Sequence, residues 1–236
     1  MSIYVLVHGG FHGGWCWDKV VPLIEKSGHH VVAPDLPGHG ADKTATTDVT
    51  LQLYVDHICT VLNEQTEPVI LVGHSMAGAV ITQVAEYLPE KISKLVYLTA
   101  FILGNGQCMN DWRTEDIPVE HALVLSKDER SMTVVKEAIQ GIFYSDCSAE
   151  DIAWAKSLLD PQATEPFGAT VKTSAGKYGS VAKIYIECLE DRAMVPELQK
   201  RIYTMHPCEK VVSINTGHSS FISAPKVLAS QLLSLK

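Results

Sequence analysis

Short runs of apolar and β-branched residues alternate along this chain with longer stretches of helical periodicity. The runs predict strands at residues 3–8, 30–33, 68–72, 92–99, 182–188 and 210–214. The longer stretches predict helices at residues 17–26, 51–63, 76–88 and 226–235. Because the runs are almost continuously apolar, we expect helices on both faces of one sheet. The alternation therefore predicts the α/β class, with a doubly wound, mostly parallel sheet of about six strands.

One stretch interrupts this alternation. Between residues 101 and 180 no convincing strand can be recognised, and two helical patterns occur near residues 131–140 and 149–159. The sheet pattern resumes afterwards, which favours an insertion within one domain over a separate small domain. We therefore expect a core of residues 1–100 and 181–236, with residues 101–180 forming a helical lid over the carboxyl edge of the sheet.

The composition is that of a globular protein and disfavours two kinds of partner. Of 236 residues, 46% are hydrophobic and 19% are charged, so the chain can bury the core of one domain. The net charge of -8 repels phosphate backbones, and we expect no nucleic-acid partner. No apolar run approaches the roughly 20 residues that span a bilayer, and no signal peptide is recognisable, so we expect no membrane partner.

Cysteine usage indicates the compartment. The chain has six cysteines, scattered and without a Cys-x-x-Cys pair, at positions 16, 59, 108, 147, 188 and 208. Dispersed cysteines in a chain of this size are typical of reduced thiols. We therefore expect a cytoplasmic protein, with disulfides or a metal site as the alternative.

The strongest chemical signal lies between the third predicted strand and the helix after it, where residues 72–78 read Val-Gly-His-Ser-Met-Ala-Gly. A serine on a sharp strand-to-helix turn is the arrangement called the nucleophile elbow. Residues two before and two after the serine must be small, because the turn brings their Cα atoms together. Gly73 meets this requirement, and Ala77 departs only mildly from the usual glycine. Ser75 is therefore the candidate nucleophile, with a helix-capping serine as the alternative.

A serine hydroxyl needs a base, and the base needs an acid that orients it. In chains with such a turn, the acid and the histidine follow the serine in that order. His218 directly follows the last predicted strand, so its loop reaches the carboxyl edge of the sheet, where open α/β folds place their sites. Asp191 follows the fifth strand and is favoured over Glu190. An acid after the fourth strand is disfavoured, because the first one there is Asp111.

A glycine-rich segment follows the first strand and reads His-Gly-Gly-Phe-His-Gly-Gly-Trp at residues 8–15. Backbone N–H groups in such a segment can hold the oxyanion that forms when a serine attacks a carbonyl. We expect one donor to be the amide of Met76, directly after the serine, and the other to come from this segment. A dinucleotide-binding loop is disfavoured, because the Gly-x-Gly-x-x-Gly spacing is missing.

Three residues are candidates for contact with a substrate. Phe101 and Trp112 lie near the start of the inserted stretch, and His12 lies in the glycine-rich segment. Packing in the core is the usual fate of aromatic side chains and is the alternative here. We expect no metal ligands.

Four segments together resemble the plant methylesterase and hydroxynitrile lyase family of α/β hydrolases, with its bacterial esterase relatives. They are residues 8–15, 34–40, 73–78 and 190–192, and residues 147–151 resemble that family's lid. The resemblance runs from the first strand to the last helix. It implies an α/β-hydrolase fold with a small cap over a buried apolar pocket and no metal or organic cofactor. It also makes a homodimer a candidate assembly. It also implies Asp191 as the acid and Gly10 as the loop donor to the oxyanion.

Members of this family divide between ester hydrolysis and cyanohydrin cleavage. The lyases have a threonine after the first strand and a lysine after the histidine, where this chain has Gly9 and Ser219. This difference favours the esterase branch. We predict a serine carboxylester hydrolase for small, largely apolar esters, with methyl esters as one candidate. The alternatives are hydroxynitrile lyase-like cleavage, a small-molecule receptor with little turnover, and another reaction of the same fold.

Overall fold

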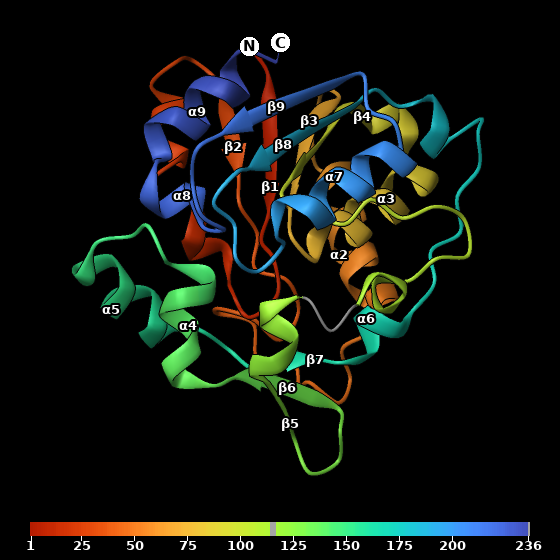
Figure 1. The fold of residues 1–236 in the computed structure, drawn as a ribbon. Helices are drawn as coiled ribbons and strands as arrows, with labels where there is room; N and C mark the ends of the chain where they lie inside the picture. The colour runs from red at the N-terminus through yellow and green to blue at the C-terminus, as the bar shows by residue number, and fades with distance from the viewer. Residues whose placement is uncertain (114–116, 236) are drawn as a thin grey trace.

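The central sheet has six strands, all parallel to their neighbours, in the order β2-β1-β3-β4-β8-β9 (Figure 1). The computed structural model describes residues 1–113 and 117–235. The strands are β1 (Ile3–Val7), β2 (His30–Val32), β3 (Val69–His74), β4 (Ile92–Leu98), β8 (Lys183–Cys188) and β9 (Lys210–Ile214). All six predicted strands and the α/β class are confirmed. Strand order reverses between β1 and β3, which is where open parallel sheets form a crevice at their carboxyl edge.

Helices cover both faces of this sheet (Figure 1). On one face lie α2 (Leu51–Asn63), α3 (Ala77–Tyr87) and α7 (Pro196–Met205), and on the other lie α1 (Val21–Glu25), α8 (Ser220–Ser223) and α9 (Pro225–Leu233). Successive strand residues point to opposite faces, so Tyr4 and Leu6 pack on the second face and Val5 and Val7 on the first. Among the described residues, none of the helices is long and apolar enough to cross a membrane.

The helices of the core differ from the prediction in several places, and α7 and α8 have no predicted counterpart. The pattern at residues 17–26 forms only the short α1, preceded by a 3₁₀ turn at Gly14–Trp17. Helix α7 was not predicted. Pro196 usually signals the interruption of a helix. At the first helical position, however, the N–H that proline lacks would have no partner within the helix, so its absence does not destabilise α7. Further 3₁₀ turns occur at Pro89–Lys91, Met109–Trp112, Pro118–Ala122 and Tyr178–Ser180.

The inserted stretch, residues 101–180, contains a small sheet that we did not expect. Strands β5 (Leu123–Leu125), β6 (Ser131–Val134) and β7 (Gln162–Ala163) pair antiparallel in that order, accompanied by α4 (Lys136–Phe143), α5 (Ala149–Leu158) and α6 (Glu165–Gly168). The prediction that this stretch contains no strand is therefore wrong. Of the helix expected near residues 131–140, the first four residues form strand β6 instead, and α4 begins at Lys136. Strands of two to four residues are too short to show an alternating pattern. Figure 1 shows these elements beyond the carboxyl end of β1.

Candidate active site

Ser75 occupies a strained turn between β3 and α3. Its φ angle is +54°, which is uncommon for a residue other than glycine. The Ser75 amide donates to the Leu98 carbonyl at 3.3 Å, which fixes the turn against the end of β4. A Cβ atom on Gly73 would lie 2.9 Å from the Ala77 carbonyl oxygen, so the turn requires the small residue expected there. Ser75 itself is half-buried and lines a cavity.

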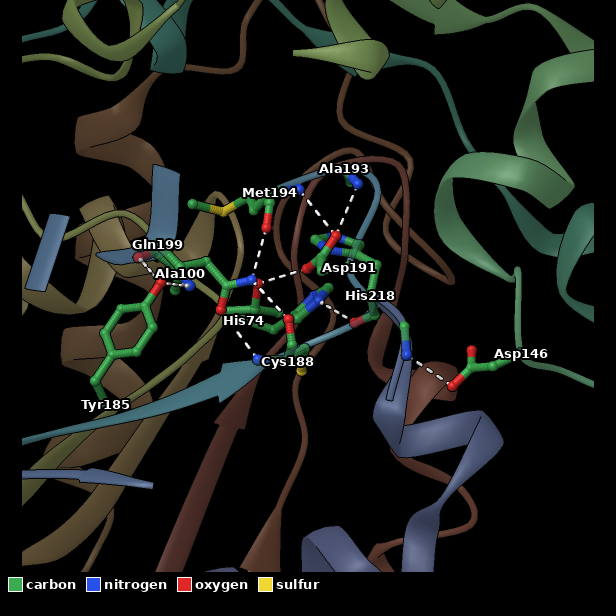
Figure 2. A network of polar contacts seen from close by, with 12 residues as sticks. His74, Ala100, Asp146, Tyr185, Cys188, Asp191, Ala193, Met194, Gln199 and His218 are labelled. Atoms are coloured by element: carbon green, nitrogen blue, oxygen red, sulfur yellow. Dashed lines mark hydrogen bonds and ion pairs between the residues drawn. The ribbon is translucent and has the colours of Figure 1, made fainter. Parts of the chain in front are cut away.

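Asp191 and His218 are in contact at the carboxyl edge of the sheet (Figure 2). The His218 Nδ1 atom lies 2.7 Å from Asp191 Oδ2, and both side chains are buried. The amides of Ala193 and Met194 donate to Asp191 Oδ1 at 2.7 and 2.9 Å. The competing acid, Glu190, is exposed. The structure therefore joins His218 to the acid that the sequence favoured.

The histidine loop is attached on both sides. His74, the residue before Ser75, donates from Nε2 to the His218 carbonyl oxygen at 3.1 Å, and the two rings lie 4.5 Å apart. The Gly217 amide donates to Asp146 of the inserted stretch at 2.7 Å. Among the described residues, no hydrogen bond joins the Ser75 hydroxyl to the His218 ring. Such bonds are often long without substrate and tighten when it binds.

The acid loop is supported by Gln199, which the sequence analysis did not single out. Its side chain is buried, and its Nε2 donates to the carbonyl oxygens of Met194 and Cys188 at 2.6 and 2.9 Å. Its Oε1 accepts from the Cys188 amide at 3.0 Å. These bonds tie α7 to both ends of the loop that carries Asp191 (Figure 2). The residue could not be recognised because the helix that carries it was not predicted.

The two residues expected to hold an oxyanion belong to the cavity wall, as Ser75 does. Gly10 and Met76 both line the cavity, and in the described part of the chain neither amide N–H donates a hydrogen bond. The next amide along, that of Phe11, is instead occupied by Gln162 Oε1 at 3.3 Å. Phe11 itself has a φ angle of +67°, which is uncommon for a residue other than glycine. The arrangement leaves two unoccupied donors next to one hydroxyl, as an oxyanion hole requires.

His12, expected to contact the substrate, lies outside the residues that line the cavity. Its ring is fully buried, with Nδ1 2.8 Å from the Gly10 carbonyl oxygen and Nε2 2.9 Å from the Tyr144 hydroxyl. Burial lowers the pKa of His12 to about 3, so the ring is neutral and a single tautomer satisfies both contacts. Nδ1 donates to Gly10, and Nε2 accepts from Tyr144. His12 therefore holds the glycine-rich segment in place.

The cavity measures about 360 Å³ and lies between the sheet edge and the inserted stretch. Phe101 and Trp112 both line it, together with mostly apolar neighbours that include Met109, Phe143, Phe167 and Leu198. Arg113 and Glu120 also reach it, but they bind each other, with Nε and Oε2 2.6 Å apart. Across the described residues, no group of three or more His, Cys, Asp or Glu side chains could hold a metal ion. The site is thus an apolar chamber with a serine at its base.

Comparison with known proteins shows which family the chain resembles over almost its whole length. Residues 4–231 match the model of the alpha/beta hydrolase family. The chain is 33% identical to putative methylesterase 11, chloroplastic, of Arabidopsis thaliana over 98% of its own length and 63% of that protein. It is 32% identical to salicylic acid-binding protein 2 of Nicotiana tabacum, covering 98% and 96% of the two chains. The crystal structure of polyneuridine aldehyde esterase superposes with a TM-score of 0.90 at 29% identity, covering 100% and 99%.

The relatives differ in length. The chain spans 54–71% of the chloroplastic methylesterases that it matches, and almost all of the tobacco protein. The family model, which matches residues 4–231, covers the main sheet from the second residue of β1 to the end of β9.

Proposed function

Since this chain belongs to the alpha/beta hydrolase family, we propose that it is a serine carboxylester hydrolase. The observation that carries the proposal is that three features lie in or directly beside one apolar cavity, with the His218 ring packed against Phe143 of the cavity wall. They are Ser75 on a strained turn, the buried contact between Asp191 and His218, and the two unoccupied amides of Gly10 and Met76. Relatives named methylesterase and esterase support the same reaction class.

In the proposed reaction, the Ser75 hydroxyl attacks the ester carbonyl carbon while His218 takes its proton. The amides of Gly10 and Met76 donate to the oxyanion of the tetrahedral intermediate. His218 then protonates the leaving alcohol, which leaves an acyl group on Ser75. A water molecule, activated by the same histidine, releases the acid. Asp191 holds the imidazole in the tautomer that bears its proton on Nδ1 and stabilises the imidazolium.

We propose neutral esters with an apolar acyl or alcohol group as substrates. The cavity wall is mostly apolar, and the charges of Arg113 and Glu120 are paired with each other. A negatively charged substrate would lose its hydration there without gaining a free cation among the described lining residues, and Glu129, which also lines the cavity, would repel it. Phe101 and Trp112 would contact the apolar group. Methyl esters are the first class to test, because several relatives are named methylesterases.

Cyanohydrin cleavage is disfavoured by packing as well as by sequence. A Cβ atom on Gly9 would lie 2.7 Å from His74 Nδ1 and 2.9 Å from Ser75 Cβ. The position has no room for the threonine that the lyases carry. Ser219, at the position of the lyase lysine, is buried and its hydroxyl has no hydrogen-bond partner.

The test is hydrolysis of p-nitrophenyl acetate and butyrate by the wild type and by Ser75→Ala, followed by a panel of methyl esters. We expect turnover by the wild type, with a burst of p-nitrophenol equal to the enzyme concentration, and background rates for the variant. Equal unfolding temperatures would show that the variant is folded. Turnover that survives in Ser75→Ala would refute the proposal. Ligand binding without turnover by the wild type would instead support a receptor.

We also propose that the protein acts in the cytoplasm and assembles as a homodimer. All six cysteines are free, which suits a reducing compartment. Some relatives are named chloroplastic, so localisation of a full-length fluorescent fusion is the relevant measurement. Light scattering coupled to size exclusion would give the mass, with 25.8 kDa expected for a monomer and twice that value for the proposed dimer.

A further inference from the structure

Thr99, directly after β4, has an unusual backbone conformation. Its φ angle is +37°, in the left-handed region that β-branched residues rarely adopt. The residue is fully buried, and its amide donates to the Ile186 carbonyl oxygen at 2.8 Å. Strain of this kind persists only where the surroundings enforce it, and it gathers at functional sites. Ser75 shows the same feature one strand away.

The Thr99 hydroxyl donates to the acid of the proposed triad. Its Oγ1 lies 2.6 Å from Asp191 Oδ2, the same oxygen that contacts His218 Nδ1 at 2.7 Å. Asp191 thus accepts two backbone amides on Oδ1, and a hydroxyl and an imidazole on Oδ2. With four donors the carboxylate has no freedom to rotate, because any rotation breaks at least one short bond.

We propose that Thr99 is a positioning residue for catalysis, whose hydroxyl aims Asp191 Oδ2 at His218 and disperses part of the carboxylate charge. The inference rests on the ester hydrolysis proposed above. The carboxyl ends of β4 and β8 meet at this point, because the strands are paired neighbours. An acid on either strand could therefore reach His218. Here β8 supplies the acid and β4 supplies a hydroxyl that holds it.

Three buried titratable groups beside this pair keep one charge state over the pH range of an esterase assay, and a fourth neighbour, Asp146, bonds to the Gly217 amide before His218. Burial lowers the pKa of His74 well below its ordinary value, so this ring stays neutral. Burial raises the pKa values of Tyr185 and Cys188, with the Asp191 charge as a second cause, and both stay protonated. A change in the pH profile that follows a substitution at Thr99 therefore reports on the pair of Asp191 and His218.

The test compares Thr99→Val with Thr99→Ser and with a matched control, Thr82→Val. Valine keeps the shape of threonine and removes only the hydroxyl. Thr82 is also fully buried and bonds to the Tyr97 hydroxyl at 2.8 Å, outside the site. In Thr99→Val we expect kcat for p-nitrophenyl butyrate to fall about tenfold, the factor for one hydrogen bond to a charged group. KM should stay close to the wild-type value.

The pH profile supplies the second readout. Without the hydroxyl, the carboxylate keeps more negative charge toward the imidazolium, so the acid limb of kcat in Thr99→Val should move to higher pH. Thr99→Ser should restore both kcat and the limb, while Thr82→Val should change neither. A Thr99→Val enzyme with wild-type kcat and an unmoved limb would overturn the inference, as would an equal loss in Thr82→Val. Background activity of Ser75→Ala in the same assay shows that the proposed function stands independently.

Discussion

Replacing Gln162 by leucine should weaken both the fold and the reaction. Gln162 lies on β7 in the inserted stretch, and its side chain is fully buried. Its Oε1 accepts from the Phe11 amide at 3.3 Å, and its Nε2 donates to the Tyr54 hydroxyl and the Ala163 carbonyl oxygen, both at 3.1 Å. Leucine has nearly the same size and can make none of these bonds.

The magnitude follows from which groups lose a partner. The Tyr54 hydroxyl keeps its contact with His39 Nε2 at 3.1 Å, so it stays satisfied. The buried Phe11 amide is left without an acceptor, which costs about 1–3 kcal/mol. We therefore expect Gln162→Leu to lower the free energy of unfolding by about 2 kcal/mol, partly offset by the added apolar surface.

The same substitution frees the segment that carries Gly10. Removing a whole oxyanion-hole donor costs 10²–10³ in kcat in well-studied hydrolases, and a displaced donor should cost less, about tenfold. Unfolding in urea gives the stability, and p-nitrophenyl butyrate hydrolysis gives kcat. Gln140→Leu is the matched control, because Gln140 is exposed on α4 of the same stretch. If Gln162→Leu lies within about 0.5 kcal/mol of the wild type, as surface changes do, and keeps full kcat, the reasoning is wrong.

Three further changes test other parts of the structure. Burial lowers the pKa of His12 to about 3 in the folded protein, whereas in the unfolded chain the ring takes a proton below about pH 6.5. The free energy of unfolding should therefore be highest above pH 6.5 and should fall as the pH drops from 6.5 toward 3. The loss is up to about 1.4 kcal/mol per pH unit for each such buried histidine. Urea midpoints that do not change from pH 7 to pH 4 would contradict this. Asp191→Asn should lower kcat by on the order of 10⁴ with the fold retained, because the amide favours the wrong tautomer of the histidine; stopped-flow acylation rates measure the loss. Gly78→Ala should lower the unfolding temperature, since its Cβ would lie 2.1 Å from the Phe101 carbonyl oxygen, whereas Gly141→Ala meets nothing within 4 Å and should be neutral or stabilising.

The main sheet could be predicted from the sequence because its strands are continuous apolar runs bounded by turns. Each of the six runs predicted one strand, and all six form one parallel sheet. The small sheet β5-β6-β7 could not be predicted. Its three strands are two to four residues long, and α4 and α5 separate the paired strands β6 and β7 along the sequence. Long-range pairing of this kind leaves no local pattern.

The residues of the candidate site could likewise be predicted only in part. Ser75, Asp191 and His218 could be found because each follows a recognisable strand, and the topology of parallel strands brings such positions to one edge. Thr99 is the last residue of the strand predicted at 92–99, but a threonine at a strand end is too common to stand out. His12 was assigned to the substrate because it lies in the glycine-rich segment. The orientation of the His12 ring depends on its contact with Tyr144, which lies far from it in the sequence.

The inserted stretch does more than line the cavity, because three of its polar residues hold the loops of the proposed triad and oxyanion hole. Asp146 accepts the Gly217 amide beside the histidine, and Gln162 accepts the Phe11 amide beside Gly10. Tyr144 donates to His12, which in turn holds the Gly10 carbonyl. A displacement of this stretch by substrate would therefore be transmitted to both the base and the oxyanion donors. Substitutions that reshape the part of the apolar wall formed by residues 101–180 should change kcat together with substrate preference, since that part and these three contacts belong to the same inserted stretch.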